Sequence, residues 1–180
     1  MRKLIEYTLV TLDGVFEDPQ SWGFAGFRDD AYLRDGLGLL MSCDAMLMGR
    51  RGYEGNARIW PGRSGTHPWA DRLNEITKYV FSSTLESAEW SNTTIVRDDP
   101  VTAVANLKDQ GGRDLLAWGH GVFVEDLFRH DLVDVLDLSI HPVIVGAGAS
   151  WSRPGQTGTM KLAATKVFAK GIVKLTYERA

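Results

Sequence analysis

The regular alternation of short apolar runs with helical patterns is the feature that most restricts the fold of this chain. Runs such as AMLM at 45–48 and LLAW at 115–118 are apolar at consecutive positions, which is typical of strands covered on both faces. The segments between such runs carry apolar residues at helical spacing. This order predicts an α/β fold with a mostly parallel central sheet. We expect strands at 3–12, 45–48, 79–81, 93–96, 115–118 and 133–140, and helices at 30–42, 69–76, 101–110 and 122–130.

The C-terminal part of the chain has a different pattern. Two strand-like segments, 161–170 and 172–178, are joined at Gly171, and they predict an antiparallel hairpin at one edge of the sheet. Residues 55–70 contain several glycines and prolines, so we expect irregular structure there. The chain has 180 residues without an internal repeat or a clear linker, which predicts a single domain over residues 1–180.

Charge and cysteine content exclude several classes of function. The net charge is −3 and the sequence pI is about 5.8, so binding to nucleic acid or to anionic membranes is not expected. The single cysteine, Cys43, excludes an internal disulfide and a cysteine-built metal cluster, and the four histidines lack metal-ligand spacing. No apolar run approaches the roughly 20 residues of a membrane helix, and Glu6 comes too early for a signal peptide. We therefore expect a cytoplasmic protein that acts on a small molecule.

Three predicted strands end in residues that suit an anionic ligand. In an open α/β sheet, ligands bind outside the carboxyl ends of the strands, where helix N-termini present unpaired N–H groups. Glycine lets a phosphate approach the backbone closely, and arginine adds positive charge. Together the ends predict a site for a ligand with several phosphates, although each is also typical of an ordinary turn, a solvated arginine or a hydroxyl cap. The three strand ends are Gly49-Arg50-Arg51, Ser82-Ser83-Thr84 and Gly119-His120-Gly121.

Motifs for several other chemistries are missing from the chain. The sequence contains no G-x-S-x-G elbow and no G-x-x-x-x-G-K-[ST] phosphate loop. The dinucleotide fingerprint G-x-G-x-x-G is incomplete as well, because no third glycine follows Gly121 at that spacing. Local patterns therefore indicate phosphate binding but leave the ligand open.

Five motifs in order resemble a known family. They are TLDGVFE at 11–17, LMGRRGYEG at 47–55, NEITKYVFSSTLESAEW at 74–90, LLAWGHGVFVEDLF at 115–128 and LVDVLDLSIHPVIVGAG at 132–148. Over nearly its full length the chain resembles the dihydrofolate reductase-like superfamily. It is most similar to the branch containing the C-terminal reductase domain of the bifunctional riboflavin-biosynthesis deaminase-reductase.

The resemblance implies a three-layer fold in which NADPH lies across the strand ends. Gly49, Arg50 and Arg51 would then meet the cofactor phosphates, and Ser82, Ser83 and Thr84 would lie near the adenosine ribose and its 2′-phosphate. The pyrophosphate would rest on Gly119, His120, Gly121 and Val122. Asp13 and Gly14 would border the nicotinamide, with Asp13 as the nearest candidate for a catalytic proton donor. NADH remains an alternative cofactor, because the stretch after the strand at 79–81 is hydroxylic and neutral.

The resemblance also implies an oxidoreductase that transfers hydride to a C=N or C=O carbon of a small heterocyclic or sugar-derived substrate. Such a transfer needs no activated nucleophile, since the cofactor carries the chemistry. The specific hypothesis is the 5-amino-6-(5-phosphoribosylamino)uracil reductase step of riboflavin biosynthesis. The alternatives are a reductase of a pterin or another small molecule, a non-catalytic nucleotide-binding protein, and a structural domain without a nucleotide. For a pterin, the predicted helix at 30–42 offers Asp29, Asp30 and Asp35 nearby.

Relatives of this kind are often homodimers, and the resemblance implies the same here. The apolar pairs Val167-Phe168 and Ile172-Val173 of the C-terminal strands suit an interface or an ordinary core equally well.

Overall fold

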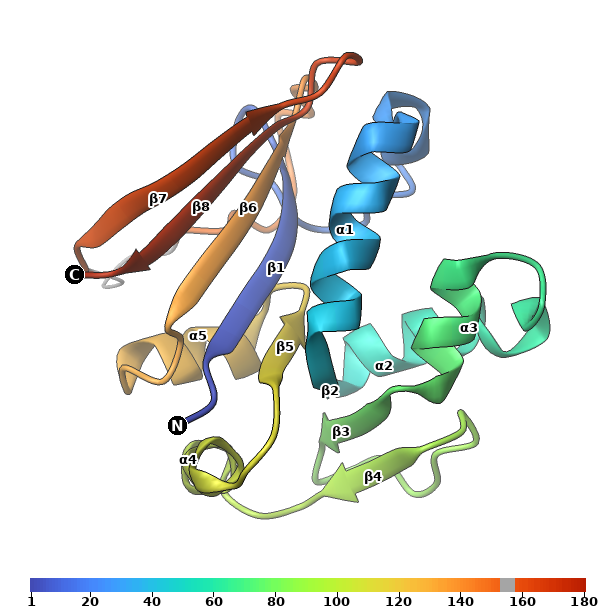
Figure 1. The fold of residues 1–180 in the computed structure, drawn as a ribbon, viewed down its shortest axis with the longest axis vertical. Coiled ribbons are helices and arrows are strands. Elements are labelled where there is room, and N and C mark those ends of the chain that lie inside the picture. The colour runs from blue at the N-terminus through green and yellow to red at the C-terminus, as the bar shows by residue number, and fades with distance from the viewer. Residues whose placement is uncertain (153–157) are drawn as a thin grey trace.

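The computed structural model of the chain describes residues 1–152 and 158–180 (Figure 1). Within these residues all strands join one sheet, in the spatial order β4-β3-β2-β5-β1-β6-β8-β7. The strands are β1 (Leu4–Thr11), β2 (Cys43–Gly49), β3 (Thr77–Phe81), β4 (Thr93–Val96), β5 (Asp114–Trp118), β6 (Val135–His141), β7 (Met160–Val167) and β8 (Val173–Arg179). The α/β fold with a mostly parallel sheet and an antiparallel C-terminal edge is confirmed.

The helices also follow the predicted order. They are α1 (Asp30–Ser42), α2 (Arg50–Ala57), α3 (Pro68–Glu75), α4 (Pro100–Asp109) and α5 (Val122–Arg129), with short 3-10 turns η1 (Phe24–Phe27) and η2 (Pro61–Arg63). The start of α2 lies at Arg50, and its last turn extends into the region 55–70 that was expected to be irregular. Beyond α2 that region consists mainly of turns around η2, as its glycines and prolines predict.

Strand direction explains where the carboxyl ends lie. β1 pairs in parallel with β5 and β6, β2 pairs in parallel with β3 and β5, and β3 pairs in parallel with β4. β8 is antiparallel to both β6 and β7, so β7 has the same direction as the parallel strands. The predicted strand 161–170 was too long at its end. β7 stops at Val167 because Phe168 and Ile172 close a turn by a backbone hydrogen bond and pack against Tyr32.

Two layers of helices cover the sheet (Figure 1). Leu40 of α1, Tyr53 of α2 and Leu73 of α3 belong to one core, and Val104 of α4 and Leu127 of α5 belong to the other. Consecutive residues of a central strand therefore enter opposite cores, as Leu115 and Leu116 of β5 do. This double burial is the physical reason for the uninterrupted apolar runs in the sequence.

Gly36 allows α1 and α3 to pack closely. A Cβ atom at Gly36 would lie 2.8 Å from Cζ2 of Trp69, whose Nε1 donates to the Leu33 carbonyl at 3.1 Å. The tryptophan ring is thus held against the helix at a position where a methyl group does not fit. At Gly38, on the exposed side of the same helix, a Cβ atom would have no other atom of the described residues within 4 Å.

These two glycines form a matched pair for a stability test. Gly36→Ala is expected to lower the free energy of unfolding by about 1–2 kcal/mol, because overpacking against Trp69 outweighs the helix propensity of alanine. Gly38→Ala is expected to raise it by up to about 1 kcal/mol. Urea denaturation of both variants measures the difference. Equal effects would show that Trp69 does not limit the packing.

Lys78 is a buried cation held by carbonyl oxygens. Its side chain is 0% exposed, and Nζ donates to the carbonyls of Ile76 at 2.7 Å and of Ser91 at 2.9 Å. Nζ also lies 4.5 Å from the centre of the Trp90 ring, a cation–π contact. Burial, followed by the charge of Arg72, lowers the pKa of Lys78 to about 8.

This pKa predicts an unusual dependence of stability on pH. The folded pKa lies below the ordinary value for lysine, so between the two values the unfolded chain holds a proton that the folded chain has lost. The free energy of unfolding of the parent protein should therefore rise relative to that of Lys78→Met between about pH 7 and pH 10, by on the order of 2 kcal/mol. Urea denaturation at several pH values gives the comparison. Lys170→Met, at an exposed lysine, serves as the control, and a pH-independent difference for Lys78→Met would contradict the argument.

Candidate functional site

The three predicted strand ends lie next to one another in the structure. β3, β2 and β5 are neighbours in the sheet and run in the same direction, so their carboxyl ends open at a common edge. The ends carry Ser82 just after β3, Gly49 as the last residue of β2, and Gly119 just after β5. The sheet thus brings together the three segments that the sequence analysis selected for phosphate binding.

The helices α2 and α5 begin at this edge without a side-chain cap. Their N-cap residues are Gly49 and Gly121, and neither provides a side-chain hydrogen bond. The other α-helices in the described ranges are capped by the side chains of Asp29, His67 and Asp99. Uncapped helix N-termini keep backbone N–H groups available, and their dipoles favour an anion. Two adjacent strands therefore lead into two helix starts that suit phosphate groups.

The turn between β5 and α5 depends on its glycines. Gly119 has φ +86° and Gly121 has φ +140°, values that residues with a side chain rarely adopt. The first hydrogen bond of α5 follows at once, from the Glu125 N–H to the Gly121 carbonyl at 2.9 Å. The strand therefore turns through two glycines into the helix because so short a connection needs positive φ angles, which residues with a side chain rarely adopt.

His120 points into the protein and not toward the strand ends. Its side chain is 0% exposed, and Nδ1 lies 2.7 Å from Oε1 of Glu6, also 0% exposed. A ligand at the turn would therefore meet the backbone of His120 and not its imidazole. Two residues later, Val122 is 69% exposed at the first position of α5.

The two arginines at the start of α2 have different surroundings. Arg50 Nε donates to Oε1 of Glu54 at 2.7 Å, and its Nη1 donates to Oγ1 of Thr84 at 2.7 Å. The second contact links the ends of β2 and β3 through a positive charge. Arg51 is exposed at the same helix start. Both positions add positive charge where an anion would lie.

At least one hydroxyl group in the loop after β3 has a structural role. Ser82 Oγ accepts hydrogen bonds from the N–H groups of Thr84 at 3.2 Å and Leu85 at 2.9 Å, so it caps the turn. Arg97, just after β4, donates to the carbonyls of Ser83 at 3.1 Å and Leu85 at 2.8 Å.

Arg97 was missed by the sequence analysis. It brings a guanidinium to the loop that lacks a basic residue of its own. The available signal was an arginine immediately after the strand that neighbours β3.

Asp13 and Gly14 connect the end of β1 to the segment after β6. Asp13 accepts hydrogen bonds from Thr11 Oγ1 at 2.5 Å and from the Gly146 N–H at 2.8 Å, and these bonds lower the pKa of its carboxyl group. Gly14 has φ +80°, and its carbonyl accepts from the Trp151 N–H at 2.8 Å. A lowered pKa keeps Asp13 ionised near neutral pH. Its catalytic role as a proton donor stays a prediction, and the geometry favours a structural role.

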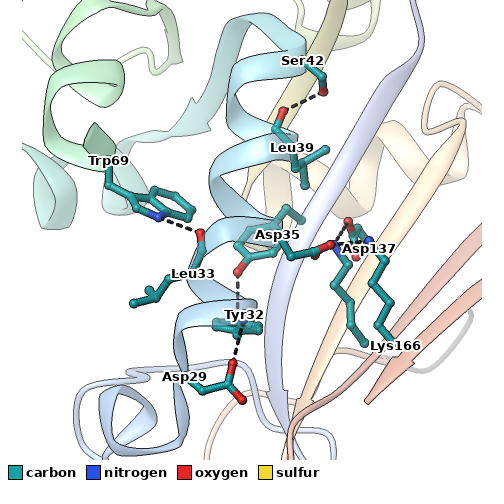
Figure 2. A network of polar contacts seen from close by, with 11 residues as sticks. Asp29, Tyr32, Leu33, Asp35, Leu39, Ser42, Trp69, Asp137 and Lys166 are labelled. Atoms are coloured by element: carbon teal, nitrogen blue, oxygen red, sulfur yellow. Dashed lines mark hydrogen bonds and ion pairs between the residues drawn. The ribbon is translucent and has the colours of Figure 1, made fainter. Parts of the chain in front are cut away.

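The aspartates near α1 already have partners. Asp29 caps the helix by accepting from the Tyr32 N–H at 2.8 Å, and Asp35 pairs with Lys166 and Lys174 (Figure 2). Lys174 also lies 2.8 Å from Asp137. This network borders a hollow of about 390 Å³ on the α1 side of the sheet. Asp30 is exposed in the first turn of α1. Asp29 and Asp35 are thus engaged within the protein.

Metal centres and membrane-spanning helices are both missing from the described part of the chain. Neither 1–152 nor 158–180 contains a group of three or more histidine, cysteine or acidic side chains arranged to hold a metal ion. In the same ranges, no helix has the length and apolar character needed to cross a membrane.

Comparison with known proteins gives one consistent result. The family model described as RibD C-terminal domain matches residues 2–174. YyaP of Bacillus subtilis (strain 168), itself described as uncharacterized, is 27% identical over 187 residues, covering 98% of this chain and 94% of its own length.

Solved structures share the fold. A Shewanella sp. PV-4 protein whose name links it to riboflavin biosynthesis has a TM-score of 0.74 at 18% identity, with 100% of this chain and 99% of that one covered. The Thermotoga maritima diaminohydroxyphosphoribosylaminopyrimidine deaminase/5-amino-6-(5-phosphoribosylamino)uracil reductase has a TM-score of 0.68 at 16% identity. The match covers 99% of this chain and 57% of the Thermotoga chain.

Proposed function

The chain belongs to the RibD C-terminal domain family, a family of reductase domains with a dihydrofolate reductase-like fold, and from this premise we propose that it is an NADPH-dependent reductase. The observation that carries the proposal is the pair of uncapped helix starts at Gly49 and Gly121, on adjacent parallel strands. A dinucleotide has the two linked phosphates that such a pair of anion sites can share.

The residues at the strand ends fit this cofactor. The N-termini of α2 and α5 would hold the phosphates through backbone N–H groups, and Arg50 and Arg51 would add charge. Gly14 and Asp13 would border the nicotinamide, which supplies the hydride when bound. The chain itself orients the two reactants.

For the substrate we propose a small molecule with a reducible C=N or C=O carbon, in the cytoplasm. The specific candidate is 5-amino-6-(5-phosphoribosylamino)uracil, which the name of the Thermotoga maritima structure gives as the substrate of that protein. A pterin is the weaker candidate, because Asp29 and Asp35 are engaged by the Tyr32 N–H and by two lysines.

A turnover assay tests this proposal. The purified protein is titrated with NADPH and with NADH, using tryptophan fluorescence, and then mixed with NADPH and 5-amino-6-(5-phosphoribosylamino)uracil. We expect saturable NADPH binding and oxidation of the cofactor by this substrate. If the protein binds NADPH but reduces neither this substrate nor other carbonyl and imine compounds, the result would support a non-catalytic nucleotide-binding protein. No binding of either cofactor at about 1 mM, the upper end of ordinary KM values, would refute the reductase.

The preference for NADPH over NADH follows, in this proposal, from two arginines that flank the loop after β3. Arg50 reaches Thr84, and Arg97 reaches Ser83 and Leu85. A 2′-phosphate bound at this loop would meet the positive charge of these two guanidinium groups, which bind phosphate well.

Removal of both arginines should therefore weaken NADPH binding selectively. In Arg50→Ala/Arg97→Ala we expect the Kd for NADPH to rise about tenfold or more, because each charge-assisted hydrogen bond contributes about 1.5–3 kcal/mol. The Kd for NADH should rise less, only by the part that Arg50 contributes to the phosphates that the two cofactors share. Arg58→Ala, at an exposed arginine just after the opposite end of α2, is the control. Equal loss of affinity for both cofactors would contradict the assignment of the 2′-phosphate.

We also propose that the protein is a homodimer. On the face of the sheet opposite α1, the register aligns Leu162 with Tyr177 and Val167 with Val173. Leu162 is 50% exposed and Val167 is 75% exposed. Lys161 and a bulge between Leu162 and Ala164 disfavour pairing through the edge of β7, so a second copy would pack on the apolar face.

A charge on this face should separate the two copies. Leu162→Lys is expected to shift the mass measured by light scattering from dimer to monomer at micromolar concentration, since an unpaired buried charge is costly. Met41→Lys is the matched control, because Met41 is also 50% exposed but lies at the end of α1. A monomeric parent protein would refute the dimer.

A further inference from the structure

A buried cluster of ionisable side chains lies directly behind the turn between β5 and α5. It consists of Glu6 from β1, His120 from the turn, and Glu125 from the first turn of α5. The side chains of Glu6 and His120 are 0% exposed, and that of Glu125 is 4% exposed. Nothing in the proposed cofactor contacts uses these side chains, so their burial needs a separate explanation.

The contacts of this cluster tie four segments of the chain together. His120 Nδ1 lies 2.7 Å from Glu6 Oε1, and its Nε2 lies 3.6 Å from Glu125 Oε1. Trp151 Nε1 donates to the same Glu6 oxygen at 3.3 Å. Phe16 contacts the imidazole edge-on, with ring centres 4.9 Å apart. The imidazole is thus fixed by β1, by α5 and by the segments that follow β1 and β6, which carry Phe16 and Trp151.

The position of Glu6 makes this arrangement costly. Leu4, two residues earlier on the same face of β1, belongs to the apolar core under α4 and α5. Glu6 Oε2 and His120 Nε2 have no hydrogen-bond partner among the described residues. An apolar side chain at position 6 would avoid the desolvation of a carboxyl group. The cluster is therefore poorly explained as a device for stability.

The turn itself provides the explanation. Gly119 and Gly121 have no side chains, so His120 is the one residue of the turn that can be anchored. Both glycines adopt backbone angles in the left-handed half of φ space, and glycine has little intrinsic preference among its many conformations. The direction of the N–H groups that follow the turn therefore depends on where the imidazole is held.

We propose that Glu6 and His120 are positioning residues that hold the turn in its anion-binding form. Glu6 acts only through His120 and does not touch the cofactor. This inference rests on the proposed reductase function, because it assigns the turn to the cofactor phosphates. The pair fixes the backbone N–H groups before the ligand arrives, so that binding does not have to order a flexible glycine turn.

Two substitutions at one position separate this role from simple packing. Glu6→Gln keeps the size and an acceptor oxygen for His120, whereas Glu6→Leu removes the acceptor. The control is Asp137→Asn, which changes a buried carboxyl group on the α1 side of the sheet. If Glu6→Leu does not fold, His120→Leu removes the same contact from its other end.

Hydrogen exchange and cofactor affinity are measured on each variant. In Glu6→Leu we expect the backbone N–H groups of residues 119–123 to exchange about tenfold faster, and the Kd for NADPH to rise about tenfold, as misplaced binding groups do. The kcat at saturating NADPH should change less than about threefold, because in this proposal Glu6 acts on the binding of the cofactor and not on the chemical step. Glu6→Gln should bring the exchange rate and the Kd for NADPH to within about threefold of the parent values. Asp137→Asn should leave the exchange rate and the Kd for NADPH unchanged.

The outcomes distinguish this inference from the proposed function. Unchanged exchange and unchanged NADPH affinity in folded Glu6→Leu would overturn the positioning role while leaving the reductase intact. Faster exchange in Glu6→Leu, combined with no NADPH binding by the parent protein, would support the anchoring of the turn and overturn the reductase. Loss of affinity in Glu6→Gln equal to that in Glu6→Leu would also count against the hydrogen bond to His120.

Discussion

Burial of the central strands on both faces is the constraint on which the rest of this structure depends. β2, β5 and β1 lie between two helix layers, so apolar side chains are favoured on both of their faces. A polar side chain in the middle of such a strand, as Glu6 is in β1, has a cost in desolvation. Chemistry is therefore confined to the strand ends and the helix starts. Because these strands are parallel, their ends meet at one edge, and backbone N–H groups become the main binding groups.

The difference between capped and uncapped helix N-termini follows from the same constraint. α1, α3 and α4 begin with Asp29, His67 and Asp99 as side-chain caps, which satisfy the first N–H groups locally. α2 and α5 begin with glycine and give up this stabilisation. Both helices start at the shared edge of β2 and β5. The absence of side-chain caps is consistent with a ligand that supplies the missing acceptors. The proposed nucleotide site rests on this argument.

Local features of the sequence were predictable, and features that depend on strand order were not. The helix at 30–42 and the turn at Gly119-His120-Gly121 follow from periodicity and glycine placement, and both were found. The contact of His120 with Glu6 requires β5 to lie beside β1, although 114 residues separate the two side chains. The contact of Arg97 with the loop after β3 likewise requires β4 to pair with β3. Side-chain direction was also hidden, so His120 was placed near phosphate when its ring points inward.

The α1-facing side of β1 and β6 limits how the proposed reduction can obtain its proton. The hydroxyl groups of Tyr7 and Tyr32 lie 2.8 Å apart, and burial raises the pKa of both, so they stay neutral. Burial lowers the pKa of His141, which is neutral as well. Burial also raises the pKa of Asp137, and its Oδ2 is paired with Lys174. Among the described residues, this wall therefore offers no unpaired carboxylate to a substrate. Asp13 is ionised at the strand end, so in the proposed reduction the proton is best supplied by water.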